Sequence, residues 1–309
     1  MKFSVCTLFR DFNRYQNLVD DFINAGFSRD SIWGLDNAQS TYDCYSAIRK
    51  FLIESHSDFT IICHDDVALN NLKLTTLASQ IANALRLYPK AAVFGVVGKD
   101  SRFIHGQGHF IGSKGEEFWG IDLHRVIVSL DECFLVVRNS LGIMVGEGLE
   151  GFHFYGTELC VQARKLGYSS HVIDFPIIHK STGTLDAAFF RAKKKYEEYL
   201  NKNGIKNIIP TTCTILYGGE NIFVKAFKDA MSITMVQQSM HKNFPDANKA
   251  IFENCSNEYP SVLLKIFLVK LRLFFLFQKF SYKKILSRIF LDLKWWRKNW
   301  ETRLPPCLK

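Results

Sequence analysis

Through its first 180 residues the chain alternates short apolar runs with longer amphipathic segments. This alternation is typical of a mostly parallel, doubly wound sheet. The expected strands are Phe3–Phe9, Ser31–Leu35, Phe59–Cys63, Ala91–Val97, Cys133–Arg138 and His171–Asp174. The expected helices are Asn13–Asn24, Thr41–Ser55, Asn71–Leu87 and Tyr155–Leu166. The sequence therefore predicts an α/β fold in which helices flank a mostly parallel sheet.

One segment interrupts this alternation. Gly98–Gly120 is rich in glycine and histidine and has no clear period, so we expect a loop there. It contains His105 and His109, for which a loop that orders over bound ligand is favoured over a metal site. Beyond residue 185 the strand pattern fades, and a charged helix is expected at Ala187–Asn203.

The basic charge of the chain belongs to its C-terminal part. Residues 1–189 carry 17 Lys and Arg against 21 Asp and Glu, whereas residues 190–309 carry 22 against 9. In the segment 261–300, basic residues interrupt every apolar run before it reaches the roughly 18–20 residues of a membrane-spanning helix. We expect a basic amphipathic helix that lies on an anionic membrane surface.

Two alternatives apply to this tail. A helical appendage could pack on the catalytic domain or on a second subunit, as in an oligomer. Nucleic acid is not an expected partner, because the tail is too apolar for a solvated phosphate-binding face.

The eight cysteines are dispersed and include no CxxC pair. This spacing argues against a zinc site and a disulfide scaffold, and it predicts reduced thiols in a cytosolic protein. The segment Met1–Phe9 is too short for the apolar part of a signal peptide. We therefore expect a cytoplasmic protein, peripheral on the inner face of the cell membrane.

Two adjacent carboxylates, Asp65 and Asp66, follow the apolar run Phe59–Cys63 and His64. Ligands of open α/β folds bind at the carboxyl ends of parallel strands, where a hard cation can bridge carboxylates to phosphate oxygens. A solvated acidic turn or a helix N-cap would show the same dipeptide. The pair is thus a candidate metal site, and the strength of this assignment depends on the other functional residues in the sequence, which form its context.

Three further acidic or imidazole groups provide that context. Glu158 falls near the start of a helix, so its carboxylate could project into a cleft and act as a general base, or could compensate the helix dipole. His179 follows an apolar run and could ligate the same cation or serve as a structural hydrogen-bonding group. Asp131 and Glu132 enter a strand and could face the hydroxyls of an acceptor.

The order of these segments resembles the bacterial glycosyltransferase-like branch of the GT-A glycosyltransferases, the family 2-like nucleotide-sugar transferases. The likeness covers about residues 1–185. The segments that carry it are His64-Asp65-Asp66-Val67, Asp131-Glu132-Cys133-Phe134, Gly151 to Cys160, and His179-Lys180-Ser181-Thr182-Gly183.

The resemblance implies a Rossmann-like GT-A catalytic domain over 1–185 and leaves the rest of the chain unexplained. For that part the sequence pattern predicts a helical or irregular extension over 186–260 and the basic helical tail over 261–309. The resemblance carries further expectations about function. It also implies a nucleotide-diphosphosugar donor, a Mn²⁺ or Mg²⁺ ion and inverting transfer to an acceptor hydroxyl in bacterial surface polysaccharide or lipid-linked oligosaccharide synthesis. The implied residues are Asp65, Asp66 and His179 for the metal, Phe9, Asp36 and Asp65 for the donor, and Glu158 and Asp131 for catalysis.

The sequence departs from this pattern at two positions. Many members of the branch carry an acid where this chain has Gly156, and the wider fold carries one at Cys63. The chain then either uses Glu158 as the base or is an inactive sugar-nucleotide-binding or scaffold protein. A metal-dependent phosphohydrolase is a further alternative, because His64 and Asp65 form an HD pair, although that class needs the pair on a helix.

Overall fold

The computed structural model describes residues 1–69, 71–101, 106–113, 115–181 and 186–219. The chain divides into two compact units, Met1–Asn257 and Glu258–Lys309, and all the described residues belong to the first. The expected tail over 261–309 and most of the extension over 186–260 lie outside the described residues. Within the described residues, no helix is long and apolar enough to cross a membrane.

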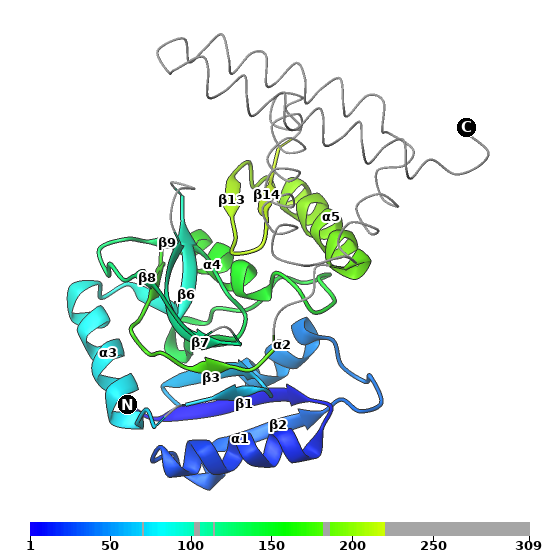
Figure 1. The fold of residues 1–309 in the computed structure, drawn as a ribbon. Coiled ribbons are helices and arrows are strands. Elements are labelled where there is room, and N and C mark those ends of the chain that lie inside the picture. The colour runs from blue at the N-terminus through cyan, green and yellow to red at the C-terminus, as the bar shows by residue number, and fades with distance from the viewer. Residues whose placement is uncertain (70, 102–105, 114, 182–185, 220–309) are drawn as a thin grey trace, which may run out of the picture. The chain divides into compact units, whose positions relative to one another are not determined.

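The central sheet has six strands (Figure 1). Their order is β11 (Ser169–Val172), β5 (Ala91–Gly95), β10 (Phe134–Arg138), β3 (Phe59–His64), β1 (Phe3–Phe9) and β2 (Ile32–Asp36). Neighbouring strands are parallel, except that β10 runs antiparallel to both β3 and β5. The predicted α/β fold with a mostly parallel sheet is therefore confirmed, and the carboxyl ends of β1, β2 and β3 share one edge.

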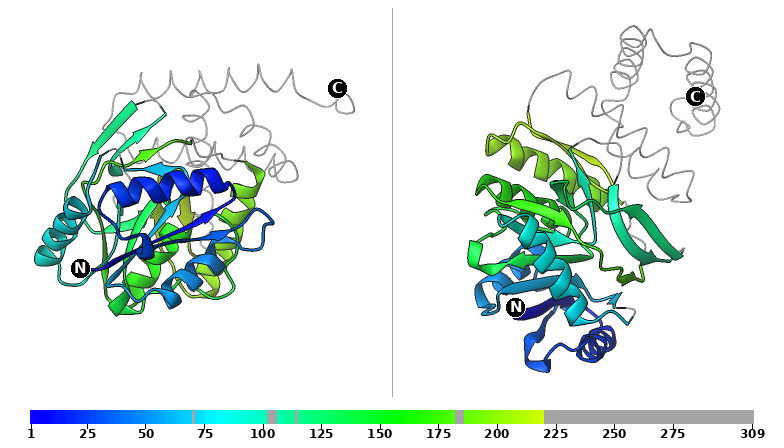
Figure 2. Two further views of the ribbon diagram at one scale, coloured as in Figure 1. Left: turned by 90° about the horizontal axis from the view of Figure 1, so that it is seen from below. Right: turned by 90° about the vertical axis from the view of Figure 1, so that its left-hand side faces the viewer.

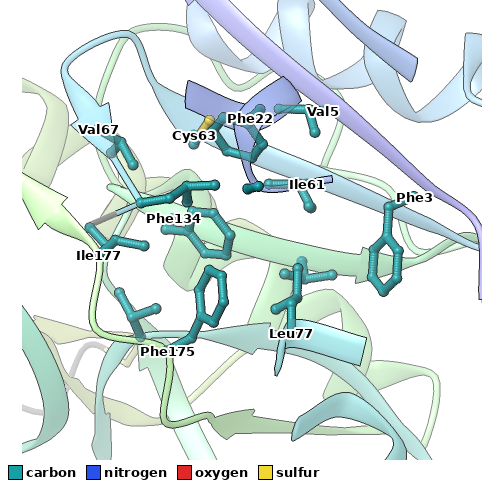
Figure 3. Close-up of a cluster of buried hydrophobic side chains, with 14 of the residues drawn as sticks. Phe3, Val5, Phe22, Ile61, Cys63, Val67, Leu77, Phe134, Phe175 and Ile177 are labelled. Carbon is teal, nitrogen blue, oxygen red and sulfur yellow. The ribbon is translucent and has the colours of Figure 1, made fainter. Parts of the chain in front are cut away.

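Helices cover both faces of this sheet because successive strand residues point to opposite sides. Ile61 belongs to the apolar core with α1 (Phe12–Asn24) and α3 (Leu74–Leu87), part of which Figure 3 shows. Its neighbour Ile62 belongs to the core with α2 (Cys44–Glu54) and α4 (Tyr155–Lys165). The β-strands are thus buried on both faces, which explains their uninterrupted apolar runs.

Side-chain caps fix where the first two helices begin. Asp11 accepts hydrogen bonds from the backbone N–H groups of Asn13 and Arg14, directly after β1. Asp43 and Ser46 form a reciprocal capping box, which starts α2 at Cys44 rather than at the expected Thr41. Such caps satisfy N–H groups that the helix itself cannot pair, so both helices start beside the carboxyl edge of the sheet.

The expectation of a loop over Gly98–Gly120 was wrong. A second sheet has the order β4 (Val67–Ala68), β12 (Ile178–His179), β7 (Gly106–Gly112), β6 (Val97–Asp100) and β9 (Ile127–Leu130), with β8 (Gly115–Gly120) paired to β7. The expected strand Ala91–Val97 is likewise divided between β5 and β6, so that the chain passes from one sheet to the other. Figure 2 shows the β7–β8 hairpin extending from the domain.

Hydrophobic periodicity does not predict these strands because they contain glycines. A Cβ atom on Gly98 would lie 2.7 Å from Ile127 Cγ2 and 2.8 Å from the carbonyl oxygen of Ser129. The neighbouring strand β9 therefore occupies the space that a side chain would need. Glycine in a strand often marks such a close backbone approach, rather than a loop.

The segment after the second sheet packs on the α2 and α4 side of the domain. Helix α5 (Ala187–Lys202) buries Phe189, Tyr196 and Leu200 in that core. The hairpin of β13 (Ile208–Pro210) and β14 (Ile215–Tyr217) follows it. The expected charged helix is thus present, and one of its faces is apolar.

We expect Gly98→Ala to destabilise the domain by about 1–3 kcal/mol, because the added methyl group has no space beside β9. Gly112→Ala is the matched control, since its Cβ would meet only the edge of the Phe110 ring, at 3.3 Å. Urea unfolding of both variants measures the difference. Equal stability of the two variants would show that β6 and β9 are not packed this closely.

Candidate functional site

A cleft lies at the carboxyl ends of β1, β2 and β3. Its volume is about 500 Å³, within the range of small-molecule sites. Arg10 and Arg14 follow β1, and Asn37 follows β2. The tip of β3 contributes His64, Asp65 and Asp66, while Phe152, Tyr155 and Ser181 come from later in the chain. A neighbouring cavity of about 160 Å³ shares four of these residues and adds Lys180.

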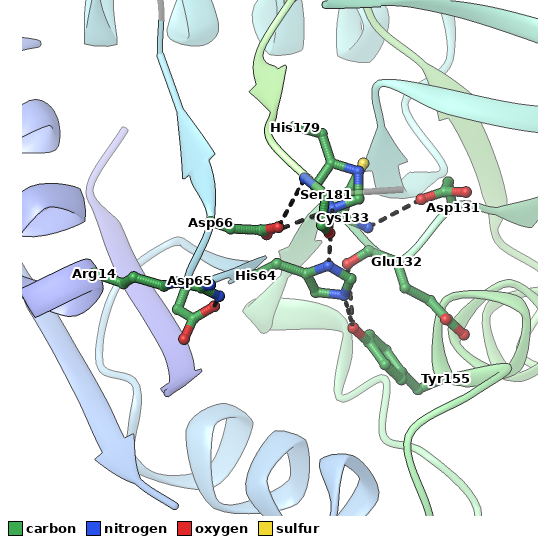
Figure 4. Close-up of polar contacts among 10 residues, drawn as sticks. All are labelled: Arg14, His64, Asp65, Asp66, Asp131, Glu132, Cys133, Tyr155, His179 and Ser181. Atoms are coloured by element: carbon green, nitrogen blue, oxygen red, sulfur yellow. Dashed lines mark hydrogen bonds and ion pairs between the residues drawn. The ribbon is translucent and has the colours of Figure 1, made fainter. Parts of the chain in front are cut away.

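Three side chains at this edge could hold a metal ion. Ligand atoms of His64, Asp66 and His179 all lie within 4.8 Å of one another, the only such group in the described part of the chain. His179 Nε2 is 3.5 Å from Asp66 Oδ1 and 3.3 Å from His64 Nδ1. Figure 4 shows the three groups converging. Imidazole and carboxylate ligands at these separations suit a divalent cation.

Two of the three metal ligands that the sequence predicted, Asp66 and His179, are electrostatically paired. Burial alone would raise the pKa of Asp66, but hydrogen bonds from His179 and Ser181 hold that pKa well below its usual range. Burial acts to lower the pKa of His179, and the hydrogen bond to Asp66 outweighs it and raises this pKa. Burial and the nearby His179 lower the pKa of His64, which favours its neutral, ligating form.

The structure places Asp65 outside this group. Its Oδ1 lies 4.0 Å from Arg14 Nη1, and its carboxylate accepts a hydrogen bond from the backbone N–H of Arg10. Burial raises the pKa of Asp65. The two adjacent acids therefore face different partners: Asp66 faces the histidines, and Asp65 faces Arg14 (Figure 4).

Of the three residues predicted to bind the donor, Asp65 lines the cleft, whereas Phe9 and Asp36 do not. Phe9 is buried and stacks on Tyr15 with ring centroids 4.3 Å apart. Asp36 is exposed and accepts a hydrogen bond from the backbone N–H of Ala38. The next residue, Asn37, lines the cleft instead. Its side chain donates a hydrogen bond to the backbone carbonyl oxygen of Tyr42 and accepts one from the backbone N–H of the same residue.

Asp131 and Glu132 lie in the connection between β9 and β10. Asp131 accepts hydrogen bonds from the backbone N–H of Cys133 at 3.2 Å and from Thr212 Oγ1 at 2.9 Å. The Glu132 carboxylate accepts from backbone N–H groups of the first turn of α4, among them Gly156. Burial and the neighbouring Asp131 raise the pKa of Glu132 to about 8.

The expectation that Glu158 projects into a cleft was wrong, because its side chain is fully buried. Its carboxylate accepts hydrogen bonds from Tyr196 at 2.6 Å and Tyr199 at 3.0 Å, both on α5. Gln162 Nε2 and the backbone N–H of Gly146 also donate to it. Glu158 therefore joins α4 to α5 and the preceding loop, and no substrate can reach it in this arrangement.

We expect Glu158→Ala to lower the free energy of unfolding by about 3 kcal/mol or more, since each buried donor left unpaired costs about 1–3 kcal/mol. Glu150→Ala is the control: Glu150 forms an ion pair with Lys195, but both side chains are exposed. Chemical denaturation measures both variants. A Glu158→Ala protein as stable as the control would contradict this role.

Several cleft residues were not predicted from the sequence, namely His64 as a ligand, Arg10, Arg14, Asn37 and Tyr155. The sequence did contain a pattern that pointed to His64. Side chains alternate along an extended chain, so His64 and Asp66 are expected on one side and Asp65 on the other. The other residues come from three separate segments, and only the fold brings them to one edge.

Comparisons with known proteins give one relative in sequence, and no family model matches the chain. The fold and site are those of an α/β domain with a candidate metal centre beside a cleft. The chain is 31% identical over 206 residues to the protein "ATP synthase subunits region ORF 6" of Fuscovulum blasticum, covering 63% of this chain and 82% of that protein. The chain belongs to the family of that protein, whose name states no activity.

Similar solved structures are glycosyltransferases, the class that the sequence motifs resemble. A mannosyltransferase from Pyrobaculum calidifontis, in complex with GDP-Man and Mn²⁺, is 10% identical with a TM-score of 0.42, covering 90% of this chain and 88% of that one. TarS 1–349 of S. aureus is 11% identical with a TM-score of 0.39, covering 76% and 71%. TM-scores below 0.5 at such identities carry no functional information about this chain.

Proposed function

We propose that this protein is a metal-dependent glycosyltransferase that moves a sugar from a nucleotide-diphosphosugar to an acceptor hydroxyl. The observation that carries the proposal is the position of the metal-ligand group at the carboxyl ends of β1, β2 and β3. His64 and Asp66 lie on the wall of the cleft, and His179 lies beside them, 3.5 Å from Asp66. In open α/β folds this edge is where ligands bind.

The charges of the cleft suit a diphosphate. Arg10 and Arg14 line it beside the acidic tip of β3, and guanidinium groups bind phosphate oxygens in bidentate fashion. A divalent cation, Mn²⁺ or Mg²⁺, held by Asp66 and the two histidines would neutralise the charge of the diphosphate leaving group. The neighbouring cavity adds Lys180 to the same positive surroundings.

The other wall of the cleft suits a nucleoside. It includes Ala47, Ile48 and Phe51 of α2, and Asn37 lies nearby at the end of β2. Binding sites of this size combine an apolar lining with a few polar groups that set orientation. We assign this part of the cleft to the nucleoside and the arginine and metal side to the diphosphate.

Transfer also requires a base that takes the proton of the acceptor hydroxyl. Glu158 is fully buried, and Asp65 faces the arginines. Glu132 is partly accessible. It lies beside the cleft, because its charge adds to the effect of burial in raising the pKa values of Cys44 and Tyr155, which line the cleft wall. Its pKa of about 8 matches a base that operates near neutral pH. We therefore assign the proton transfer to Glu132.

Glycine at position 156 makes room for this carboxylate. A Cβ atom there would lie 3.3 Å from Glu132 Cγ and 2.6 Å from the carbonyl oxygen of Leu130. A side chain at position 156 is therefore excluded, and Glu132 occupies the space beside the first turn of α4. This packing favours an active enzyme over the inactive sugar-nucleotide-binding protein that the absence of an acid at position 156 suggested.

The chemical step is then a single displacement. The acceptor oxygen attacks the anomeric carbon, and its proton passes to a Glu132 carboxylate oxygen. The bond between the anomeric carbon and the phosphate oxygen breaks, and its electron pair leaves with the nucleoside diphosphate. One displacement at the anomeric carbon inverts its configuration.

This geometry argues against the phosphohydrolase alternative. His64 ends a strand rather than lying on a helix, and Asp65 faces Arg14 rather than His64. The two residues of the HD pair therefore do not bind the same ion.

The basic C-terminal sequence motivates the biological setting that we propose. Residues 190–309 carry 22 basic and 9 acidic side chains, a composition that suits an anionic membrane surface. A lipid-linked or growing surface glycan on the inner face of the cell membrane would then be the acceptor.

We expect the protein to release nucleoside diphosphate from at least one of UDP-glucose, UDP-galactose, UDP-GlcNAc and GDP-mannose when Mn²⁺ is present. Asp66→Ala should lower this rate by about 100-fold or more, because it removes charge stabilisation at the leaving group. Asp20→Ala, an exposed acid on α1, is the control. Donor binding without turnover of any donor would instead support the inactive sugar-nucleotide-binding protein.

We expect Glu132→Gln to slow the same reaction, with water or a sugar as acceptor, by about 100-fold or more, as loss of a general base does. The rise in melting temperature caused by UDP and Mn²⁺ should persist, since donor binding is retained. Glu150→Gln, an exposed acid, serves as the control. Loss of activity in Asp131→Asn but not in Glu132→Gln would transfer the role to Asp131.

A further inference from the structure

The ring of His64 contacts a different group at each nitrogen. Its Nδ1 lies 3.3 Å from His179 Nε2, within the metal-ligand group, and its Nε2 lies 2.8 Å from the hydroxyl of Tyr155. The hydroxyl of Tyr155 also lies 3.2 Å from the backbone carbonyl oxygen of Glu132. A short chain of polar contacts therefore runs from the metal-ligand group through His64 and Tyr155 to the backbone (Figure 4).

The donors and acceptors fix the direction of these hydrogen bonds. The backbone carbonyl oxygen of Glu132 can only accept, so the Tyr155 hydroxyl donates its single proton to that oxygen. The Tyr155 oxygen then accepts from the protonated Nε2 of His64. A neutral imidazole with its proton on Nε2 has its lone pair on Nδ1, the nitrogen that faces His179 and Asp66.

We infer that His64 is a third protein ligand of the metal and that Tyr155 positions it by holding the ligating tautomer. The metal itself belongs to the proposed function, on which this inference rests. Second-sphere hydrogen bonds commonly fix the tautomer of ligating histidines in this way.

The structure exchanges one expected oxygen ligand for a nitrogen ligand. A site built from Asp65, Asp66 and His179 would offer two carboxylates and one nitrogen. The structure turns Asp65 toward Arg14 and brings His64 in its place, so that two of the three protein ligands are nitrogen atoms.

Metal binding to the full chain without nucleotide tests the inference. We expect calorimetry to show that His64→Ala and Tyr155→Phe each weaken Mn²⁺ binding by about 10-fold or more. Asp65→Ala, the control next to both ligands in sequence, should change it by less than about threefold.

Pulsed electron paramagnetic resonance of bound Mn²⁺ gives a readout that a general loss of stability would not imitate. Two imidazole nitrogen couplings are expected in the wild-type protein and one in His64→Ala. Thermal unfolding of each variant verifies that it is folded.

Three results would overturn the inference: Mn²⁺ affinity unchanged by Tyr155→Phe, an Asp65→Ala loss as large as that of His64→Ala, or nitrogen couplings unchanged by His64→Ala. Donor turnover in the wild-type protein separates the two proposals. Full turnover together with any of these results would refute the His64 assignment and leave the proposed glycosyltransferase activity standing.

Discussion

The short antiparallel ladder between β4 and β12 is the contact on which the site depends. It pairs Val67 with His179 and Ala68 with Ile178. Because β4 begins directly after Asp66, this pairing brings the carboxylate and the imidazole together from distant parts of the chain. The backbone N–H of Ser181 then donates to Asp66 Oδ2 at 3.1 Å, which fixes the carboxylate as well as the strand. The second sheet therefore supplies His179 and holds it and Asp66 beside His64, which ends a strand of the first sheet.

A buried carboxylate has a comparable role on the opposite side of His64. Glu158 fixes α4 against α5, and the first residue of α4 is Tyr155. The loop before it contains Phe154 at φ +69°, a left-handed conformation that costs a non-glycine residue free energy and needs support from its surroundings. That support includes the hydrogen bond from Tyr45 to the backbone of His153. An acid far from the chemistry thus determines where the Tyr155 hydroxyl lies.

The sequence was sufficient for those parts of the fold that follow from local pattern. Apolar runs gave the strands of the central sheet, and its helices begin or end within a few residues of the predicted positions. The second sheet was missed because Gly98 and Gly108 remove the alternation that marks a strand, and the reason for those glycines is a neighbouring strand visible only in three dimensions. In the same way, Asp66 and His179 could be singled out from the sequence. The burial of Glu158 could not, since it depends on tyrosines from α5.

The two adjacent acids show why residue type alone does not assign a role. Asp65 and Asp66 share a strand end, yet burial raises the pKa of Asp65 while His179 and Ser181 hold that of Asp66 well below its usual range. Each carboxylate faces its own positive or donating partner. These partners act against the repulsion between the two acids, through which Asp66 adds to the rise in the pKa of Asp65. An anionic ligand entering the cleft would meet Arg10 and Arg14 on the Asp65 side and the metal-ligand group on the Asp66 side. Two adjacent acids can therefore have different roles in one site: one can orient arginines, and the other can bind a cation.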